Sequence, residues 1–321
     1  ALPINIKRIR DTLSDYGIEY DVWFSEKSLH DSGAVKETVD FLVKEGYTIE
    51  KDGAIWLNGE KLGLEKDEVL IRNNGVPTYM AADIAYHRNK FITRGFDLAI
   101  NLWGADHHGH VARMKAAMKP FGIDEKQLEV VLFQLVRLYR NGEIARMSKR
   151  SGKTISLGDL LEEVGRDAAR FIFNMKTSGS HLDFDLDLAV KQSNDNPVFY
   201  VQYAHARICS ILRKLAEEGI VLRQINDVDL TLLNKDEETE LIRKLSEYPE
   251  EITLAAKTLE PSRITRYVMD VAASFHSFYN ACRVKGEEEE LMMARLMLVD
   301  CTRIVIKNVL ELISINAPEK M

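Results

Sequence analysis

The chain has 321 residues, 45% of them hydrophobic and 29% charged, which is ordinary for a globular protein of about two domains. No stretch reaches the ~18 consecutive apolar residues of a membrane-spanning helix, and the N-terminus lacks the apolar core of a secretory signal. The formal net charge of −7 counts against a uniformly basic nucleic-acid binder. It still permits local Lys/Arg patches, because salt screens each charge beyond about 10 Å.

The first 150 residues show patterns of both helix and strand. Helical spacing of apolar residues predicts helices at 4–13, 34–44, 79–93 and 111–118. Strand-like runs occur at 20–24, 54–57, 69–72 and 97–103. Turn signals stand at Asp52-Gly53 and Asn73-Asn74-Gly75. Strand, glycine-containing turn and helix form the repeating unit of doubly wound sheets, so this part is predicted to be α/β.

After residue 156 the chain is predicted to be almost entirely helical. Ser156 can cap a helix at 157–164 that Gly165 ends, and Asp167 can cap another at 168–175. Long apolar stripes predict helices at 201–215, 264–278 and 291–312. The acidic run 287–290 indicates a solvated helix start. The best domain boundary is at Asn196-Pro197, since proline disfavours helix in the preceding residue. The predicted fold class is thus α/β followed by all-α.

The three cysteines, Cys209, Cys282 and Cys301, lie far apart without CxxC spacing. This excludes a zinc knuckle and a disulfide framework by sequence and favours a reducing cytoplasm. Each cysteine falls in an apolar helical pattern, so a buried structural role is favoured over chemistry.

The stretch from Ala145 to Lys153, ARMSKRSGK, combines cations, a hydroxyl and a flexible glycine. Polyphosphate chemistry needs such groups near the developing charge. The alternative is a solvated basic loop, and Met-Ser-Lys alone is a weak motif.

The stretch from Trp103 to His110, WGADHHGH, lies between a predicted strand and a predicted helix. Gly104 allows a ligand to approach the backbone closely, and Asp106 could bind a ribose hydroxyl. The three histidines suggest a metal site as the alternative, but they are too close in sequence to converge without a distorted backbone.

Tyr79 and Asp83 lie four residues apart and therefore on one helix face. A guanidinium would suit Asp83, because a fork-shaped cation pairs well with a carboxylate. The alternative is an ordinary helix in which Asp83 pairs with Arg88 or His87.

Together these segments resemble the class I aminoacyl-tRNA synthetases, and among them the bacterial-type arginyl-tRNA synthetase family. Arg146-Met-Ser-Lys-Arg150 matches the KMSKS loop, and Gly104-x-Asp106 matches the glycine and acid of the preceding βα unit. Longer phrases follow in the family's order: TYMAADIAYH (78–87), WGADHHGH (103–110), HLDFDLDLA (181–189), NPVFYVQYAHAR (196–207) and NAPEKM (316–321).

The resemblance implies roles for residues at matching positions. The implied catalytic residues are Arg146, Ser148 and Lys149. The implied ATP-binding residues are Gly104, Asp106, His107 and Met147, and the implied arginine-binding residues are Tyr79 and Asp83. The resemblance also implies Mg²⁺ brought in with ATP, no zinc or other resident metal, transfer of arginine to tRNA(Arg), and a monomeric, cytoplasmic enzyme that does not bind membranes.

The helical part resembles the family's anticodon-binding bundle, in which Tyr200, Ala204, Tyr279 and Met321 match positions that face the anticodon loop. Aromatic rings suit that task, because unstacked bases stack on them. Core packing is the alternative for the two tyrosines. The implied domains are the second half of a Rossmann-type catalytic domain (1–155), a helical connector (156–195) and the anticodon-binding bundle (196–321).

Two departures from the family pattern stand out. Arg146 replaces the first lysine of KMSKS and keeps the charge in a planar form. The family's HIGH motif is not in its expected place: His107-His108-Gly109-His110 spells H-x-G-H but lies only 37 residues before Met147. We interpret it as a coincidence and expect the true motif and an N-terminal tRNA-binding domain to precede Ala1. The chain alone is therefore expected to be inactive.

Two other functions compete with this ligase fragment. The helical part could be a tRNA-binding module without catalysis. The chain could also resemble another class I enzyme, such as the cysteinyl-tRNA synthetase, but the missing zinc-type cysteines and the phrase at 78–87 argue against that.

Overall fold

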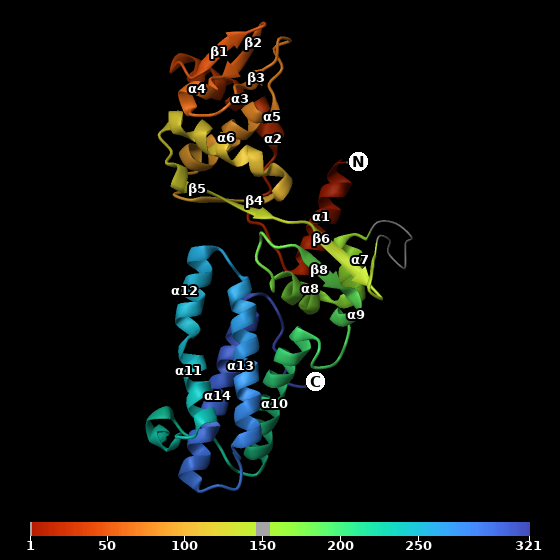
Figure 1. Ribbon diagram of the computed structural model, residues 1–321, viewed down its shortest axis with the longest axis vertical. Coiled ribbons are helices and arrows are strands. Elements are labelled where there is room, and N and C mark those ends of the chain that lie inside the picture. Colours follow the sequence, from red (N-terminus) through yellow and green to blue (C-terminus); the bar gives the residue numbers. More distant parts are fainter. Residues whose placement is uncertain (1, 146–154) are drawn as a thin grey trace. The chain divides into compact units, whose positions relative to one another are not determined.

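The computed structural model describes residues 2–145 and 155–321. The predicted loop residues Arg146, Met147, Ser148 and Lys149 therefore lie outside the described residues. The chain forms two compact units, Tyr20–Leu135 and Ala1–Glu19 with Val136–Met321 (Figure 1).

The first half of the unit Tyr20–Leu135 contains an antiparallel sheet with the strand order β1-β2-β3. Its strands are β1 (Thr48–Lys51), β2 (Ala54–Leu57) and β3 (Glu68–Ile71), and its helices are α2 (Glu26–Asp31), α3 (Ala34–Lys44) and α4 (Gly59–Leu62). Asp52 and Gly53 have φ values of 53° and 72°. Both values are in the left-handed region, and the turn predicted at Asp-Gly joins the antiparallel strands β1 and β2 as a hairpin.

The second half of this unit is a parallel βαβ arrangement. The strands β4 (Ala99–Gly104) and β5 (Leu128–Phe133) pair in parallel, with Gly104 opposite Phe133. Parallel strands need a crossover, which α6 (His108–Met118) supplies. The helix α5 (Tyr79–Arg88) precedes β4 and continues into a π-helical turn, Asn89–Thr93. One apolar core joins these elements, and Leu42, Ile84, Met114 and Leu128 are fully buried in it.

The other unit begins with α1 (Leu2–Tyr16) and a small mixed sheet of strand order β7-β6-β8. The elements of this part are β6 (Val136–Arg140), β7 (Glu143–Ile144), α7 (Leu157–Val164), α8 (Arg166–Phe173), β8 (Leu182–Asp185) and α9 (Leu186–Ala189). The guanidinium of Arg170 donates to the carbonyl oxygens of Tyr16 (3.0 Å) and Ile313 (2.7 Å). Both ends of the chain are thereby held against α8.

An all-helical bundle completes this unit, with long helices lying side by side in Figure 1. Its helices are α10 (Pro197–Glu217), α11 (Asp236–Ser246), α12 (Tyr248–Thr258), α13 (Ser262–Ala281) and α14 (Glu289–Leu312). Asn196 caps α10 by accepting from the backbone N–H of Val198, and Pro197 occupies the first turn. Proline suits that position because its missing N–H would have no helical partner there.

The predicted order of α/β followed by all-α is confirmed, but two local predictions are wrong. Residues 20–24 form no strand. Their aromatic side chains pack instead, with Phe24 stacked on Tyr86. Asp167 does not cap α8, which begins at Arg166 after Gly165. Its carboxylate accepts hydrogen bonds from Gln202 and Asn316.

Within the described ranges, no helix is both long enough and apolar enough to cross a membrane.

Candidate functional site

Helix α5 presents Asp83 one turn after Tyr79. Thr78 begins the helix: its hydroxyl accepts from the N–H of Ala81 and donates to the carbonyl of Val69 on β3. Tyr79 is 79% exposed, and the carboxylate of Asp83 is partly exposed. The start of α5 is thus fixed to the sheet while both predicted side chains stay accessible.

The Asp83 carboxylate has a partner that sequence reasoning missed. Nε2 of His110 on α6 lies 3.3 Å from Oδ2 of Asp83, and the indole of Trp103 packs beside His110 with ring centroids 5.4 Å apart. The alternative pairing predicted for the Asp83 carboxylate is wrong, because the Arg88 side chain donates to Glu37, and His87 bonds to the backbone carbonyl of Asp83 and not to its carboxylate. No signal in the sequence linked His110 to Asp83, which stands 27 positions earlier.

His87 anchors α5 to β4 inside the unit. Its Nδ1–H donates to the Asp83 carbonyl and its Nε2 accepts from Nδ2 of Asn101, each at 2.7 Å. This arrangement requires a neutral imidazole, and burial lowers the pKa of His87 to about 4. The neutral ring therefore fixes the backbone from which Asp83 projects.

Strand β4 ends at Gly104, two residues before Asp106 and three before His107. A Cβ built on Gly104 would collide with Oδ1 of Asp106, so glycine at this position lets the carboxylate keep the place it has in the structure. Asp106 and His107 are exposed, and Nε2 of His107 is 3.8 Å from Oδ2 of Asp106. An exposed carboxylate after a parallel strand is suited to bind a ribose.

Among the residues that the structure describes, no three His, Cys, Asp or Glu side chains are grouped so that they could hold a metal ion. In particular, His110 faces Asp83 while His107 faces Asp106.

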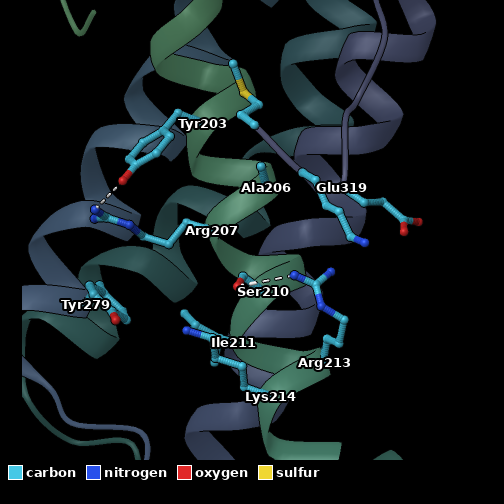
Figure 2. A pocket seen from close by; sticks show the side chains of 11 residues that line it. Tyr203, Ala206, Arg207, Ser210, Ile211, Arg213, Lys214, Tyr279 and Glu319 are labelled. Carbon is cyan, nitrogen blue, oxygen red and sulfur yellow. Dashed lines mark hydrogen bonds between the residues drawn. The ribbon is translucent and has the colours of Figure 1, made fainter. Parts of the chain in front are cut away.

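A separate cavity of about 550 Å³ lies in the helical bundle (Figure 2). Side chains of α10, Tyr279 of α13 and the C-terminal tail line it: Tyr203, Ala206, Arg207, Ser210, Ile211, Arg213, Lys214, Tyr279, Glu319, Lys320 and Met321. Two of the four predicted anticodon-binding residues, Tyr279 and Met321, therefore face one cavity.

Arg207 lies between aromatic rings at this cavity. Its guanidinium carbon is 4.8 Å from the ring centre of Tyr203 and 5.2 Å from that of Tyr279. It also donates to the hydroxyl of Tyr203 at 3.0 Å. Burial and the nearby Arg207 lower the pKa of His276, which fits a neutral ring that accepts from Arg207. Rings and a cation arranged in this way can stack on nucleobases.

The other two predicted residues are not among those that line the cavity. Tyr200 packs against His276, with ring centroids 5.0 Å apart. Ala204 is fully buried in the core of the bundle, so it can influence a ligand only through the packing of α10. Sequence reasoning missed Tyr203 and Arg207, although both stand in the phrase at 196–207.

The tail that carries Met321 is tied to α10. Nδ1–H of His205 donates to the carbonyl of Pro318 at 2.9 Å, and Gln202 donates to the carbonyl of Asn316 at 2.8 Å. Burial lowers the pKa of His205, which favours the neutral form. These bonds hold the end of the tail at the cavity.

Comparisons with known proteins identify the families of the two parts of the chain. Residues 6–194 match the family model described as "tRNA synthetases class I (R), catalytic domain". Residues 201–321 match the model described as "DALR anticodon binding domain". Together the two matches agree with the predicted order of a Rossmann-type catalytic part followed by a helical anticodon-binding part.

Two similar curated proteins, both named arginine–tRNA ligase, come from Ruminiclostridium cellulolyticum (71% identical) and Acetivibrio thermocellus (70% identical). Each alignment covers all of this chain but only 57% of the relative, so the chain spans little more than half their length. The solved arginyl-tRNA synthetase of Thermus thermophilus shares the fold, with a TM-score of 0.85 at 24% identity over 100% of this chain and 64% of that one. Because the catalytic-domain model matches more than half of its residues, the chain belongs to the class I arginyl-tRNA synthetase family.

Proposed function

We propose that the chain is part of an arginine–tRNA ligase, which activates arginine with ATP and transfers it to tRNA(Arg). The observation that carries this proposal is the accessible Asp83 carboxylate on α5, held by His110. A carboxylate in this setting suits a guanidinium or ammonium group. The names of the relatives support the same substrates.

The residues of the unit Tyr20–Leu135 would bind arginine and the nucleoside of ATP. Asp83 would pair with the positive charge of arginine, and Tyr79 would cover it from one turn earlier on α5. Gly104 would leave room for the adenosine, while Asp106 and His107 would contact its ribose. These roles favour a reaction in which the arginine carboxylate attacks the α-phosphorus of ATP and pyrophosphate leaves.

The catalytic loop of this reaction would be Arg146, Met147, Ser148 and Lys149, which lie outside the described residues. Their cations and hydroxyl would stabilise charge on the phosphates as pyrophosphate departs. Mg²⁺ would accompany ATP as part of the substrate. A hydroxyl of the terminal tRNA ribose would then attack the arginyl carbonyl and AMP would leave.

The helical bundle would bind the anticodon loop of tRNA(Arg). Tyr279 and Met321 would contact bases in the cavity of Figure 2, Tyr200 would support the rings through His276, and Ala204 would set the packing of α10. We further propose the domain ranges 1–155, 156–195 and 196–321 and a monomeric, cytoplasmic full-length enzyme.

The test of the catalytic proposal is aminoacylation by a protein of the relatives' full length that contains this chain. Arginine should be attached to tRNA(Arg) in the presence of ATP, and the 321-residue chain alone should not catalyse arginine-dependent ATP–pyrophosphate exchange. Full exchange activity of a chain verified to be 321 residues long would refute the proposed division of the active site. Charging with another amino acid would refute the assignment to arginine.

The chain by itself is proposed to be an RNA-binding module, because the bundle cavity is built entirely within one unit. Fluorescence anisotropy with a labelled anticodon stem-loop tests this. We expect the chain to prefer an arginine anticodon, and Tyr279→Ala to weaken binding about 10-fold, as loss of one base–ring stack would.

A further inference from the structure

A second cavity of about 430 Å³ adjoins the cavity of Figure 2 in the helical bundle. Its lining residues are Ile211, Lys214, Leu215, Glu218, Tyr279, Cys282, Arg283, Val284 and Lys285. It shares Ile211, Lys214 and Tyr279 with the first cavity. The two cavities are therefore parts of one groove between α10 and α13. The first cavity is here called the inner groove, and the second is called the outer groove.

The outer groove has an apolar floor and a basic rim. Leu215, Cys282 and Val284 are buried, while the side chains of Lys214 and Arg283 are exposed. An apolar floor suits the faces of sugars and bases, and exposed cations at the edge suit phosphates. The combination is typical of a surface that follows a nucleic-acid strand.

The charge of the groove opposes that of the whole chain. Its lining includes the basic residues Arg207, Arg213, Lys214, Arg283, Lys285 and Lys320. Its acidic side chains are Glu218 and Glu319, so the lining side chains carry 6 − 2 = +4 while the chain carries −7. Such a concentration of one sign attracts a polyanion.

Two of these cations are available to a ligand. Glu218 accepts from Nζ of Lys285 at 2.7 Å and is thereby occupied. In the described part of the chain, neither Lys214 nor Arg283 has an ion-pair partner.

The segment that carries Arg283 is held in place from inside the bundle. The buried Arg295 donates to the backbone carbonyl of Arg283 at 2.6 Å and to the carboxylate of Glu287 at 3.1 Å. A fixed backbone reduces the entropy lost when a side chain on it binds a ligand.

We propose that the inner and outer grooves form one RNA site, in which Lys214 and Arg283 bind the phosphodiester backbone of the strand that continues from the anticodon bases. The inference rests on the proposed role of the inner groove. From Tyr203 to Leu215 the groove follows about 18 Å of α10 at 1.5 Å per residue. That length accommodates about five stacked nucleotides at about 3.4 Å each, more than one base triplet.

The test uses the 321-residue chain and a fluorescein-labelled stem-loop RNA with an arginine anticodon, titrated by anisotropy at several salt concentrations. Lys214→Gln combined with Arg283→Gln should weaken binding about 10-fold. It should also make the dependence of log Kd on log salt concentration shallower by about 1.4, because each phosphate contact on a single strand contributes about 0.7. The charge-retaining pair Lys214→Arg with Arg283→Lys should keep the original slope.

The matched control is Lys257→Gln combined with Arg266→Gln, which removes two exposed charges from α12 and α13 outside both cavities. It should leave affinity within about two-fold and the slope unchanged. If the groove variant keeps the full slope, or the control loses as much, the outer groove is not a phosphate site. If the wild-type chain binds the RNA without preferring an arginine anticodon, the anticodon assignment is wrong. The salt dependence of log Kd can still be measured in that case, and it still tests the phosphate site of the outer groove. A wild-type chain that does not bind the RNA would overturn both.

Discussion

Arg295 and Glu238 form an ion pair in the interior of the helical bundle. Nε of Arg295 on α14 lies 2.6 Å from Oε1 of Glu238 on α11, and neither side chain exposes more than 2% of its surface. The second oxygen of Glu238 accepts from the backbone N–H of Lys235. Burial opposes ionisation, but the bonds from Lys235 and Arg295 outweigh it and lower the pKa of Glu238. The pair connects the start of α11 with the segment that carries Arg283.

Glu238→Gln should destabilise the bundle strongly, because the guanidinium of Arg295 loses its fully buried carboxylate partner and keeps only the partly exposed carboxylate of Glu287. Breaking a buried pair from one side costs about 3–5 kcal/mol. The control Glu240→Gln removes an exposed partner of Arg243 on the same helix and should cost less than about 1 kcal/mol. Urea unfolding followed by circular dichroism at the helix band measures both changes.

The same experiment has an internal reference. The three tryptophans, Trp23, Trp56 and Trp103, all belong to the unit Tyr20–Leu135. Glu238→Gln should therefore shift the helix-band transition and leave the transition in tryptophan fluorescence in place. Equal stability of the two Glu→Gln variants would contradict the structural role of the buried pair.

The unit Tyr20–Leu135 should lose stability in mild acid because of His87. Its folded pKa of about 4 lies below the ~6.5 of an unfolded histidine, so the folded state prefers the neutral ring. The stabilisation is complete above the unfolded pKa and is lost as pH falls towards 4. From pH 7 to pH 5 the loss is about 2 kcal/mol.

Tryptophan fluorescence during urea unfolding at pH 7 and pH 5 measures this loss. His87→Gln removes the titrating ring and should make the stability less dependent on pH. His30→Gln changes an exposed histidine of α2 and should leave the pH dependence unchanged. A His87→Gln variant with the same pH dependence as the wild type would show that other groups carry it.

The sequence allowed helices with a full apolar stripe to be predicted closely, as α3, α13 and α14 show. It did not reveal α11, whose sequence DEETELIRKLS is mostly charged and whose buried residues are Glu238 and Leu241. The buried glutamate has no apolar signature, because its burial depends on Arg295, 57 residues away.

The close approach of Asp106 to Gly104 at the end of β4 follows from their nearness in sequence. The pairing of Asp83 with His110 was not predictable, because it depends on how α5 packs against α6. The apolar stripe likewise predicted the helix at 201–215 that holds Ala204, but it left out Tyr200 and could not show that Tyr203 and Arg207 line the cavity.

Gly104→Ala should impair nucleotide binding without unfolding the protein. The added Cβ would displace the carboxylate of Asp106, an exposed side chain that can rotate away at little cost. In the full-length enzyme we expect the KM for ATP to rise at least about 10-fold, as the loss of one charge-assisted hydrogen bond to a ribose would produce. Gly109→Ala is the matched control, since its Cβ would meet only the end of the Arg113 side chain at an ordinary distance. Equal KM values for the two variants would contradict the role of Asp106.

Asp83→Asn should raise the KM for arginine more than the KM for ATP. The amide keeps the shape of the side chain but loses the charge that would pair with arginine, and a charge-assisted bond contributes about 1.5–3 kcal/mol, or about 10- to 150-fold in binding. His110→Gln should have a smaller effect of the same kind, because it removes the partner that orients the carboxylate. Glu37→Gln removes a different acid that faces α5 through Arg88 and should leave both KM values unchanged. Steady-state ATP–pyrophosphate exchange with the full-length enzyme and tRNA separates the two constants. If Asp83→Asn changed only the KM for ATP, the carboxylate would belong to the nucleotide site and arginine would have to be bound by other residues.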